Sequence, residues 1–314
     1  MRVYDSLTGL KDRYPNITVA LGTFDGLHLG HQRLIGEAAA MARQSQGTAA
    51  VLTFNPHPLA VLKPELAPSM LLDQEAKSRM MAELGVDVLI LLPFTREFAQ
   101  LSPAEFIKDI LINQINVKGI VVGYNYSFGH RGRGNPETLW QYAEECGYTL
   151  SVIPPVKVGN QVVSSTLIRH KLAEGDVAAA RKLLGYYPFT EGTVVLGDRR
   201  GNTLGFPTAN IHCPAGMMVP AKGVYSVHVD MGGETYLGVA NVGTKPTFNG
   251  CSRRINIEVH ILDFCGDIYG KKIRVKYVRR LRDERKFSSI SDLVNQIQAD
   301  VQSARFDHPE LSNN

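Results

Sequence analysis

Two histidines near the start of the chain lie among glycines, in a segment whose residue types suit phosphate binding. His28 and His31 are three residues apart, so one helical turn would point both imidazoles at the same phosphates. Glycines let backbone N–H groups approach an anion closely. A helix that begins near His31 adds unpaired donors and a partial positive charge. The glycines of this segment are Gly22, Gly26 and Gly30.

The chemistry that such a loop supports is nucleotidyl transfer. A site of this kind holds a triphosphate and stabilises the charge that develops as pyrophosphate leaves, and it needs no nucleophile of its own. The alternative is a glycine-rich turn with two incidental histidines. The order of apolar strand, glycines, histidines and helix in residues 19–44 favours the phosphate site.

Two later segments contain polar residues that could contribute to the same nucleotide site. Asn55 follows an apolar run in Phe-Asn-Pro-His-Pro and offers an amide, whereas His57 is either a ligand or an ordinary loop residue. Asn125 lies in Gly-Tyr-Asn-Tyr-Ser-Phe-Gly at the end of another apolar run. The aromatic residues of that segment either stack on a flat ring or pack into the core; they are Tyr124, Tyr126 and Phe128.

A third segment, Ser-Ser-Thr-Leu-Ile-Arg, suggests a second clamp for phosphates. Ser164 or Ser165 can cap the N-terminus of a helix. Arg169 lies four residues after Ser165, on the same helix face. Hydroxyls at a helix start and an arginine one turn later bind phosphate well. The alternative is an ordinary cap with a surface arginine.

The second half of the chain carries its own candidate residues. Thr208 and Asn210 are two apart, so on an extended chain both point to one side, where a hydroxyl and an amide oxygen could bind Mg²⁺ together with ATP. Residues 255–261 alternate apolar and polar side chains, which puts Glu258 on the polar face of a strand. There it is either a general base that accepts the proton of an attacking hydroxyl or a solvated surface residue.

These residues need a scaffold, and the first 185 residues alternate short apolar runs with stretches of helical periodicity. Strands that alternate with helices predict an α/β fold with a parallel sheet covered on both faces. Ligands of such sheets bind outside the carboxyl ends of the strands. We expect strands at 17–24, 49–54, 86–92, 119–123 and 149–153, and helices at 31–44, 74–84, 103–114, 136–146, 165–173 and 176–184.

The pattern changes after Gly-Tyr-Tyr-Pro at 185–188, so we predict domains at 1–185 and 186–314. Short strand-like runs between turns rich in glycine and proline predict a small antiparallel barrel or sandwich. Residues 288–305 instead predict a helix that caps it, with one apolar face. The expected strands are 190–196, 224–230, 235–242, 255–262 and 272–278, and the helix face comprises Ile290, Leu293, Val294, Ile297 and Val301.

Composition and charge indicate where in the cell the protein is expected and which partners it has. The chain has 314 residues, a net charge of +4 and four cysteines. Its N-terminal segment has no apolar signal core, and no apolar run is long enough for a membrane span. We expect a cytoplasmic protein with reduced thiols and no membrane partner. The basic residues of 271–286 alternate with apolar ones, which favours a strand with a solvated face over nucleic-acid binding.

The motifs together resemble those of the bacterial bifunctional riboflavin kinase/FMN adenylyltransferases, also called FAD synthetases. The first half carries Gly-Thr-Phe-Asp-Gly-Leu-His-Leu-Gly-His at 22–31, Phe-Asn-Pro-His-Pro at 54–58 and Ser-Ser-Thr-Leu-Ile-Arg at 164–169. The second half carries Leu-Gly-Phe-Pro-Thr-Ala-Asn at 204–210 and Leu-Arg-Asp-Glu-Arg-Lys-Phe at 281–287. The His-x-x-Gly-His element alone marks only a wider superfamily, whereas the set of motifs is more specific.

The resemblance implies a Rossmann-like nucleotidyltransferase domain that makes FAD from FMN and ATP, and a barrel that makes FMN from riboflavin and ATP. It implies Glu258 as the base of the kinase, Thr208 and Asn210 at Mg²⁺–ATP, and His28 and His31 at the adenylyl-transfer step. The same matching motifs imply nucleotide contacts from Gly22, Phe24, Asp25, Gly26, Asn55, Asn125, Ser164, Ser165, Arg169 and Gly205.

Three positions depart from the family pattern. Tyr186 and Asn202 stand where basic residues are expected, and Lys245 stands where arginine is common. We expect no nucleic-acid partner and a monomer or weak homo-oligomer. Two alternatives stay open at this point: a nucleotidyltransferase for another acceptor, and a flavin-sensing or nucleic-acid-binding regulator that has lost catalysis.

Overall fold

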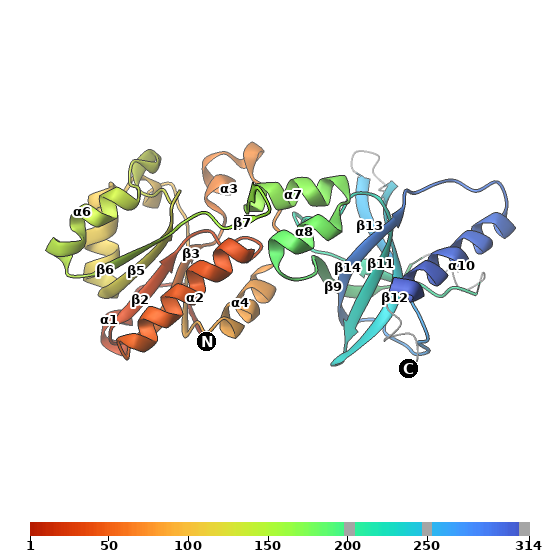
Figure 1. The fold of residues 1–314 in the computed structure, drawn as a ribbon, viewed down its shortest axis with the longest axis horizontal. Helices are drawn as coiled ribbons and strands as arrows, with labels where there is room; N and C mark the ends of the chain where they lie inside the picture. The colour runs from red at the N-terminus through yellow and green to blue at the C-terminus, as the bar shows by residue number, and fades with distance from the viewer. Residues whose placement is uncertain (198–204, 247–252, 308–314) are drawn as a thin grey trace. The chain divides into compact units, whose positions relative to one another are not determined.

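The computed structural model describes residues 1–197, 205–246 and 253–307, and it divides the chain into two compact units, Met1–Ser165 and Thr166–Asn314 (Figure 1). Each unit has its own sheet. The α/β fold of the first half and the antiparallel barrel of the second are both confirmed.

The first unit is built on a parallel six-stranded sheet in the order β1-β4-β3-β2-β5-β6. β2 lies between β3 and β5, and all five of its residues are buried, as expected for a strand covered on both faces. The expected strands are all present, and β1 is an additional edge strand of three residues. The strands are β1 Arg2–Tyr4, β2 Ile17–Leu21, β3 Thr48–Phe54, β4 Val88–Leu92, β5 Val117–Gly123 and β6 Thr149–Ile153.

Helices cover both faces because successive strand residues point to opposite sides. In β3, Ala50 and Leu52 join the core that contains the helix Phe106–Ile115, whereas Ala49 packs against Ala39 and Ala42 of α2. The helices of this unit are α1 Leu10–Arg13, α2 Leu29–Gln44, α3 Pro58–Leu62, α4 Gln74–Glu83, α5 Pro103–Glu105, η3 Phe106–Ile115 and α6 Pro136–Cys146, and a short hairpin pairs β7 Lys157–Val158 with β8 Gln161–Val162.

The helix expected at 103–114 differs from the prediction. It begins as a short α-helical turn, α5, with a capping box between Ser102 and Glu105, and it continues as a π-helix, η3. Asn116 ends it in the left-handed conformation, with φ 59°. Apolar periodicity detects the helix but does not distinguish α from π hydrogen bonding, because both bury a continuous face.

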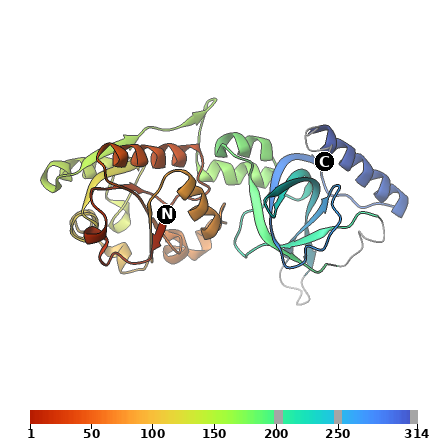
Figure 2. The same ribbon diagram turned by 90° about the horizontal axis from the view of Figure 1, so that it is seen from below.

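The second unit is a closed six-stranded antiparallel barrel in the order β10-β13-β12-β11-β14-β9 (Figure 2). Closure settles the choice between barrel and sandwich that the sequence left open. Tyr225 and Tyr277 are fully buried, at 0% and 1% exposure, with their rings edge to face. The strands are β9 Phe189–Val195, β10 Ala209–His212, β11 Gly223–Met231, β12 Glu234–Pro246, β13 Arg253–Ile261 and β14 Lys272–Arg282.

The helices α7 Ser165–Glu174 and α8 Val177–Leu184 belong largely to the barrel unit. Arg280 of β14 donates hydrogen bonds to the carbonyl oxygens of Glu174, at 3.5 Å, and of Lys222, at 2.6 Å. The division of the chain into units therefore falls after Ser165, before both helices. The functional boundary expected between residues 185 and 186 stays a prediction.

The last helix, α10 Ile290–Asp307, packs on the outer face of β11 and β12 (Figure 1). Ala304 contacts Val224 and Val239 in a small core cluster. The predicted apolar face was wrong at Ile290, which is 68% exposed, because the helix only begins there. Asp300, which lies outside that predicted face, is instead buried and paired with Arg282 at 2.8 Å.

The basic stretch at 271–286 forms β14, with Ile273, Val275 and Tyr277 buried. Four cations of this stretch pair with acidic residues of the same unit. These pairs are Arg274–Glu191, Lys276–Asp230, Arg280–Asp283 and Arg282–Asp300.

Candidate active sites

The phosphate loop connects β2 to α2 at the carboxyl edge of the sheet. The helix begins at Leu29, so His28 is its N-cap, and the His28 Nδ1 accepts a hydrogen bond from the His31 backbone N–H at 3.3 Å. The two imidazoles are stacked, with ring centroids 3.6 Å apart. Because His28 Nδ1 accepts, the proton of the neutral ring sits on Nε2, which leaves that atom as a donor.

His31 is held in its neutral form. Burial lowers its pKa well below the ordinary value of 6.5, and electrostatic interactions with the neighbouring His28 and Lys77 lower it further. The Phe24 ring packs edge-on against the imidazole, at 5.3 Å between centroids. The His31 Nδ1 is buried without a hydrogen-bond partner among the described residues. A buried polar atom in that state calls for a ligand or a water.

The loop glycines make room for neighbouring side chains. A Cβ on Gly26, whose φ is 82°, would lie 2.5 Å from Leu71 Cδ1. A Cβ on Gly22 would lie 3.1 Å from the Phe24 ring, and one on Gly30 would lie 3.1 Å from His28. Phe24 itself has a φ of 49°, unusual for a residue other than glycine. The glycines thus permit the compact loop that brings the two histidines together.

Asp25 holds this loop in place. Its carboxylate is 1% exposed and accepts the backbone N–H of Leu71 at 3.0 Å and of Leu72 at 3.4 Å. The Ser165 hydroxyl donates to the Asp25 carbonyl oxygen at 2.8 Å. Both residues were expected at the nucleotide, and the contacts seen here are with the protein backbone.

Two exposed asparagines flank the loop. Asn55 follows β3 and Asn125 lies two residues after β5, the strands on either side of β2, so both lie at the same edge of the sheet as His28. His57 is the N-cap of α3 and accepts from Leu59 N at 3.2 Å. Of the nearby aromatic residues, Tyr126 and Phe128 stack on one another against the core, whereas Tyr124 is 46% exposed.

The expected serine–arginine clamp is divided between the two units. Ser164 directly precedes α7 and is half-buried. Arg169 lies within α7, in the second unit, and is also half-buried. A joint role for these residues at the phosphates stays a prediction.

On the barrel, Glu258 lies in a row of polar residues on the outer face. The register places it opposite Asn210 of β10 on one side and Asn241 of β12 on the other. Asn256 Nδ2 donates to Glu258 Oε1 at 2.8 Å, and the glutamate is half-buried. His260, also on this face, bonds the Pro207 carbonyl oxygen at 2.8 Å and so fixes the segment that leads to β10.

Asn210 lies opposite this glutamate, and Thr208 is two residues earlier, directly before β10 begins. Asn210 is 8% exposed, and a Cβ on Gly197 would lie 2.0 Å from its Nδ2. A hydroxyl, an amide oxygen and a nearby carboxylate form a donor set that suits a hard divalent cation. Within the described residues no group of three His, Cys, Asp or Glu side chains could hold a metal. Gly205 is exposed, with a φ of 81°.

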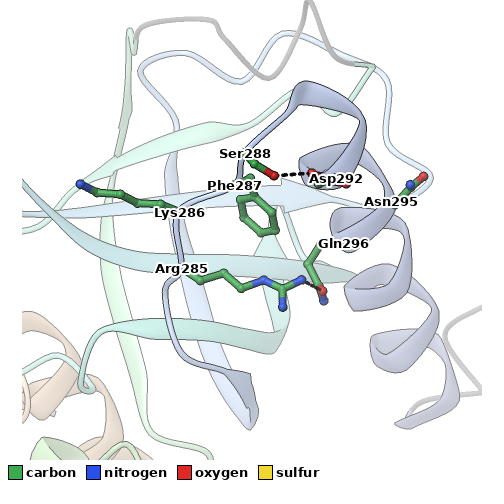
Figure 3. A pocket seen from close by; sticks show the side chains of 7 residues that line it. All are labelled: Arg285, Lys286, Phe287, Ser288, Asp292, Asn295 and Gln296. Carbon is green, nitrogen blue, oxygen red and sulfur yellow. Dashed lines mark hydrogen bonds between the residues drawn. The ribbon is translucent and has the colours of Figure 1, made fainter.

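A pocket of about 450 Å³ opens between α10 and the segment that follows β14 (Figure 3). It adjoins the polar row, because Asn241 Nδ2 donates to Glu284 Oε1 at 3.2 Å and Arg285 is the first lining residue. Its volume is in the range of small-molecule pockets, ~300–1,000 Å³. The lining residues are Arg285, Lys286, Phe287, Ser288, Asp292, Asn295 and Gln296.

Of the three departures, Tyr186 packs near Phe189, at 5.9 Å between ring centroids. Lys245 lies on β12 opposite Arg254. Asn202 lies outside the described residues, as does Cys251.

Sequence reasoning missed two residues beside these sites. Asn241 adjoins Glu258, and only the strand register reveals it. Lys77 of α4 is 3% exposed near the phosphate loop. The sequence does indicate that Lys77 faces inward, because it lies four residues before Met81 and therefore on the same face of a predicted helix.

The two sites lie on two different folds, and both present groups suited to phosphate esters. The first is the loop of His28 and His31 on the α/β unit, and the second is the polar row around Glu258 on the barrel unit.

Comparison with known proteins identifies the family. A family model described as FAD synthetase matches residues 11–167, and one described as riboflavin kinase matches residues 184–306. The bifunctional riboflavin kinase/FMN adenylyltransferase of Listeria monocytogenes is 40% identical over 92% of this chain and 92% of that protein. The protein of the same name from Bacillus subtilis is 39% identical over 94% and 93%. The chain belongs to the bifunctional riboflavin kinase/FMN adenylyltransferase family.

A solved structure has the same architecture over nearly its whole length. It is described as a macrolide-efflux protein from Streptococcus pneumoniae, is 36% identical, has a TM-score of 0.87, and covers 97% of this chain and 98% of that one. In the described part of the present chain, no helix has the length and apolar character needed to cross a bilayer.

Proposed function

We propose that the two activities of this family are divided between the two folds of the chain. The chain is an enzyme that phosphorylates riboflavin with ATP to give FMN and adenylylates FMN with ATP to give FAD and pyrophosphate. The α/β unit carries the adenylyl transfer and the barrel carries the phosphorylation. The FAD synthetase and riboflavin kinase models support this division, because they match separate halves of the chain.

The adenylyl transfer is assigned to the loop between β2 and α2. In this reaction a phosphate oxygen of FMN attacks the α-phosphorus of ATP, and the bond from that phosphorus to the bridging oxygen breaks, so that pyrophosphate leaves with the electron pair. His28 and His31 donate hydrogen bonds to the departing phosphates, and the stacked pair at 3.6 Å is the observation that carries this assignment. Asn55, Asn125, Ser164, Ser165 and Arg169 complete the nucleotide site.

Riboflavin phosphorylation is assigned to the polar row on the barrel. Glu258 accepts the proton of the ribityl hydroxyl as that oxygen attacks the γ-phosphorus of ATP. The bond from that phosphorus to the bridging oxygen breaks, and ADP leaves with the electron pair. The neighbouring Asn210 and Asn241 keep the carboxylate in a polar setting. The pocket that begins at Arg285 takes riboflavin, since Glu284 links it to the same row through Asn241.

The cation that accompanies ATP is Mg²⁺, which prefers oxygen ligands and keeps several waters. Thr208 and Asn210 would hold it on the barrel, where it would neutralise charge on the phosphates. Calorimetry checks this: Mg²⁺ should bind the protein weakly alone and tightly only with ATP. We also propose a cytoplasmic monomer or weak homo-oligomer with no nucleic-acid partner.

One experiment tests the division of labour. The purified chain is incubated with riboflavin, ATP and Mg²⁺, and FMN and FAD are separated by chromatography. His28→Ala should lower FAD formation by about 10²-fold or more, as loss of one preorganised donor does, while FMN formation continues. Equal loss of both products would contradict the assignment of His28 to one site.

A further inference from the structure

A buried lysine beside the phosphate loop has no part in the sites described so far. Lys77 of α4 is 3% exposed. Among the residues that the structure describes, its ammonium makes no hydrogen bond or ion pair. A buried charge that makes no direct hydrogen bond or ion pair is disfavoured. A lysine in this position therefore indicates that an anion binds next to its ammonium group.

The phosphate loop itself holds α4 in place. The Asp25 carboxylate accepts the backbone N–H of Leu71 at 3.0 Å, and Leu71 Cδ1 occupies the space that a side chain on Gly26 would need. Two residues later, Asp73 caps α4. Lys77 follows one turn into that helix, so the contacts of Asp25 and Gly26 fix its distance from the loop.

The electrostatic effects agree with the placement of Lys77 that these backbone contacts set. Burial lowers the pKa of Lys77, and the Asp25 carboxylate opposes that effect. The charge of Lys77 in turn lowers the pKa of His31, whose Nδ1 has no partner among the described residues. The ammonium of Lys77 thus belongs to the same group as the imidazoles of His31 and His28. The nearby Asp25 carboxylate also accepts hydrogen bonds from two backbone N–H groups, those of Leu71 and Leu72.

We propose that Lys77 is a phosphate-binding residue of the adenylyl-transfer site, where its ammonium meets the phosphates of ATP that leave as pyrophosphate. The proposal rests on the assignment of that reaction to the loop of His28 and His31. Negative charge increases on the leaving phosphates as the bond to the α-phosphorus breaks, and a cation fixed nearby stabilises that charge. The neutral histidines donate hydrogen bonds, whereas Lys77 supplies the full positive charge.

A purely structural role is the competing explanation, in which Lys77 only offsets the charge of Asp25. Binding of inorganic pyrophosphate separates the two, because it reports on the phosphate subsite without turnover. Calorimetry with pyrophosphate and Mg²⁺ compares the wild-type chain with Lys77→Met and Lys77→Gln. The matched control is Lys118→Met, since Lys118 is exposed at the opposite end of β5.

Loss of a charged hydrogen bond predicts roughly 10- to 100-fold weaker pyrophosphate binding in both Lys77 variants. The control should bind as the wild type does, and circular dichroism should be unchanged throughout. Wild-type affinity in either Lys77 variant overturns the proposal. The proposal is also overturned if the Lys118→Met control binds pyrophosphate as weakly as the Lys77 variants do.

The same measurement on His28→Ala distinguishes this proposal from the function on which it rests. If His28→Ala binds pyrophosphate normally and still makes FAD, the site assignment itself fails. If His28→Ala is impaired but the Lys77 variants are not, only the role of Lys77 fails. Riboflavin phosphorylation by each sample serves as an internal activity control, since we assign it to the barrel.

Discussion

At the scale of single residues, the neutral state of His31 has a consequence for stability. The pKa of His31 in the folded chain lies well below 6.5, the ordinary value that applies once the chain unfolds. Below pH ~6.5 the unfolded chain therefore binds a proton that the folded chain does not, and stability falls as the pH falls toward the folded pKa. Above that range the contribution is fully present.

We therefore expect the α/β unit to lose stability between pH ~6.5 and ~5, and His31→Gln to lose less over that interval. Urea unfolding at several pH values, followed by circular dichroism, measures both. An identical pH dependence in the variant and the wild type would show that His31 titrates normally in the folded chain.

Glu258 carries the second residue-scale prediction. Glu258→Gln keeps the shape of the side chain and its contact with Asn256 but removes its basicity. Riboflavin phosphorylation should fall by about 10²–10⁴-fold, the contribution of a general base. Supplied FMN should still be converted to FAD. Near-normal phosphorylation by the variant would make Glu258 a surface residue of β13 and require another base.

At the scale of elements, the attachment of α10 depends on a buried ion pair. Arg282 of β14 donates to both carboxylate oxygens of Asp300, and the aspartate side chain is 6% exposed. Since this helix forms one wall of the riboflavin pocket that we propose, its attachment and phosphorylation should be linked.

Asp300→Ala leaves the Arg282 guanidinium without its partner and should destabilise the barrel by about 3 kcal/mol, as breaking a buried pair does. Urea unfolding measures this, with Gln298→Ala on the exposed face of the same helix as the control. Phosphorylation should weaken while FAD formation from FMN persists. A loss below about 1 kcal/mol, typical of exposed pairs, would mean that α10 is held by its apolar contacts.

At the scale of the whole molecule, the boundary between the two domains can be placed at two positions. The motifs place the kinase at 186–314, whereas the packing of α7 and α8 places the start of the second unit at Thr166. Residues 187–314 expressed alone should phosphorylate riboflavin and make no FAD. Residues 166–314 should do the same and unfold at a higher temperature, because the fragment retains the buried Leu183 and Leu184 of α8.

Differential scanning calorimetry and product chromatography on the two fragments test this. FAD production by either fragment, when folded, would contradict the division of activities. Equal melting temperatures would show that α7 and α8 add nothing to the barrel.

The sequence alone determined the fold class and the chemistry, because both depend on local order. Apolar runs alternating with helical periodicity predict a parallel sheet, and the segment from Gly22 to His31 predicts a phosphate loop, since a strand, glycines and a helix start lie consecutively. The alternation around Glu258 likewise predicts that it lies on a polar face of its strand.

Only the tertiary structure decided what lies beside these residues. The start of α4, which carries Lys77, is brought to the loop because Asp25 binds the backbone of Leu71, a contact between residues far apart in the chain. Asn241 adjoins Glu258 because the strand register aligns β12 with β13. Closure into a barrel was equally undecided, since the same alternation of apolar and polar side chains fits a sandwich. Local patterns set which face a residue occupies, but long-range pairing sets its neighbours.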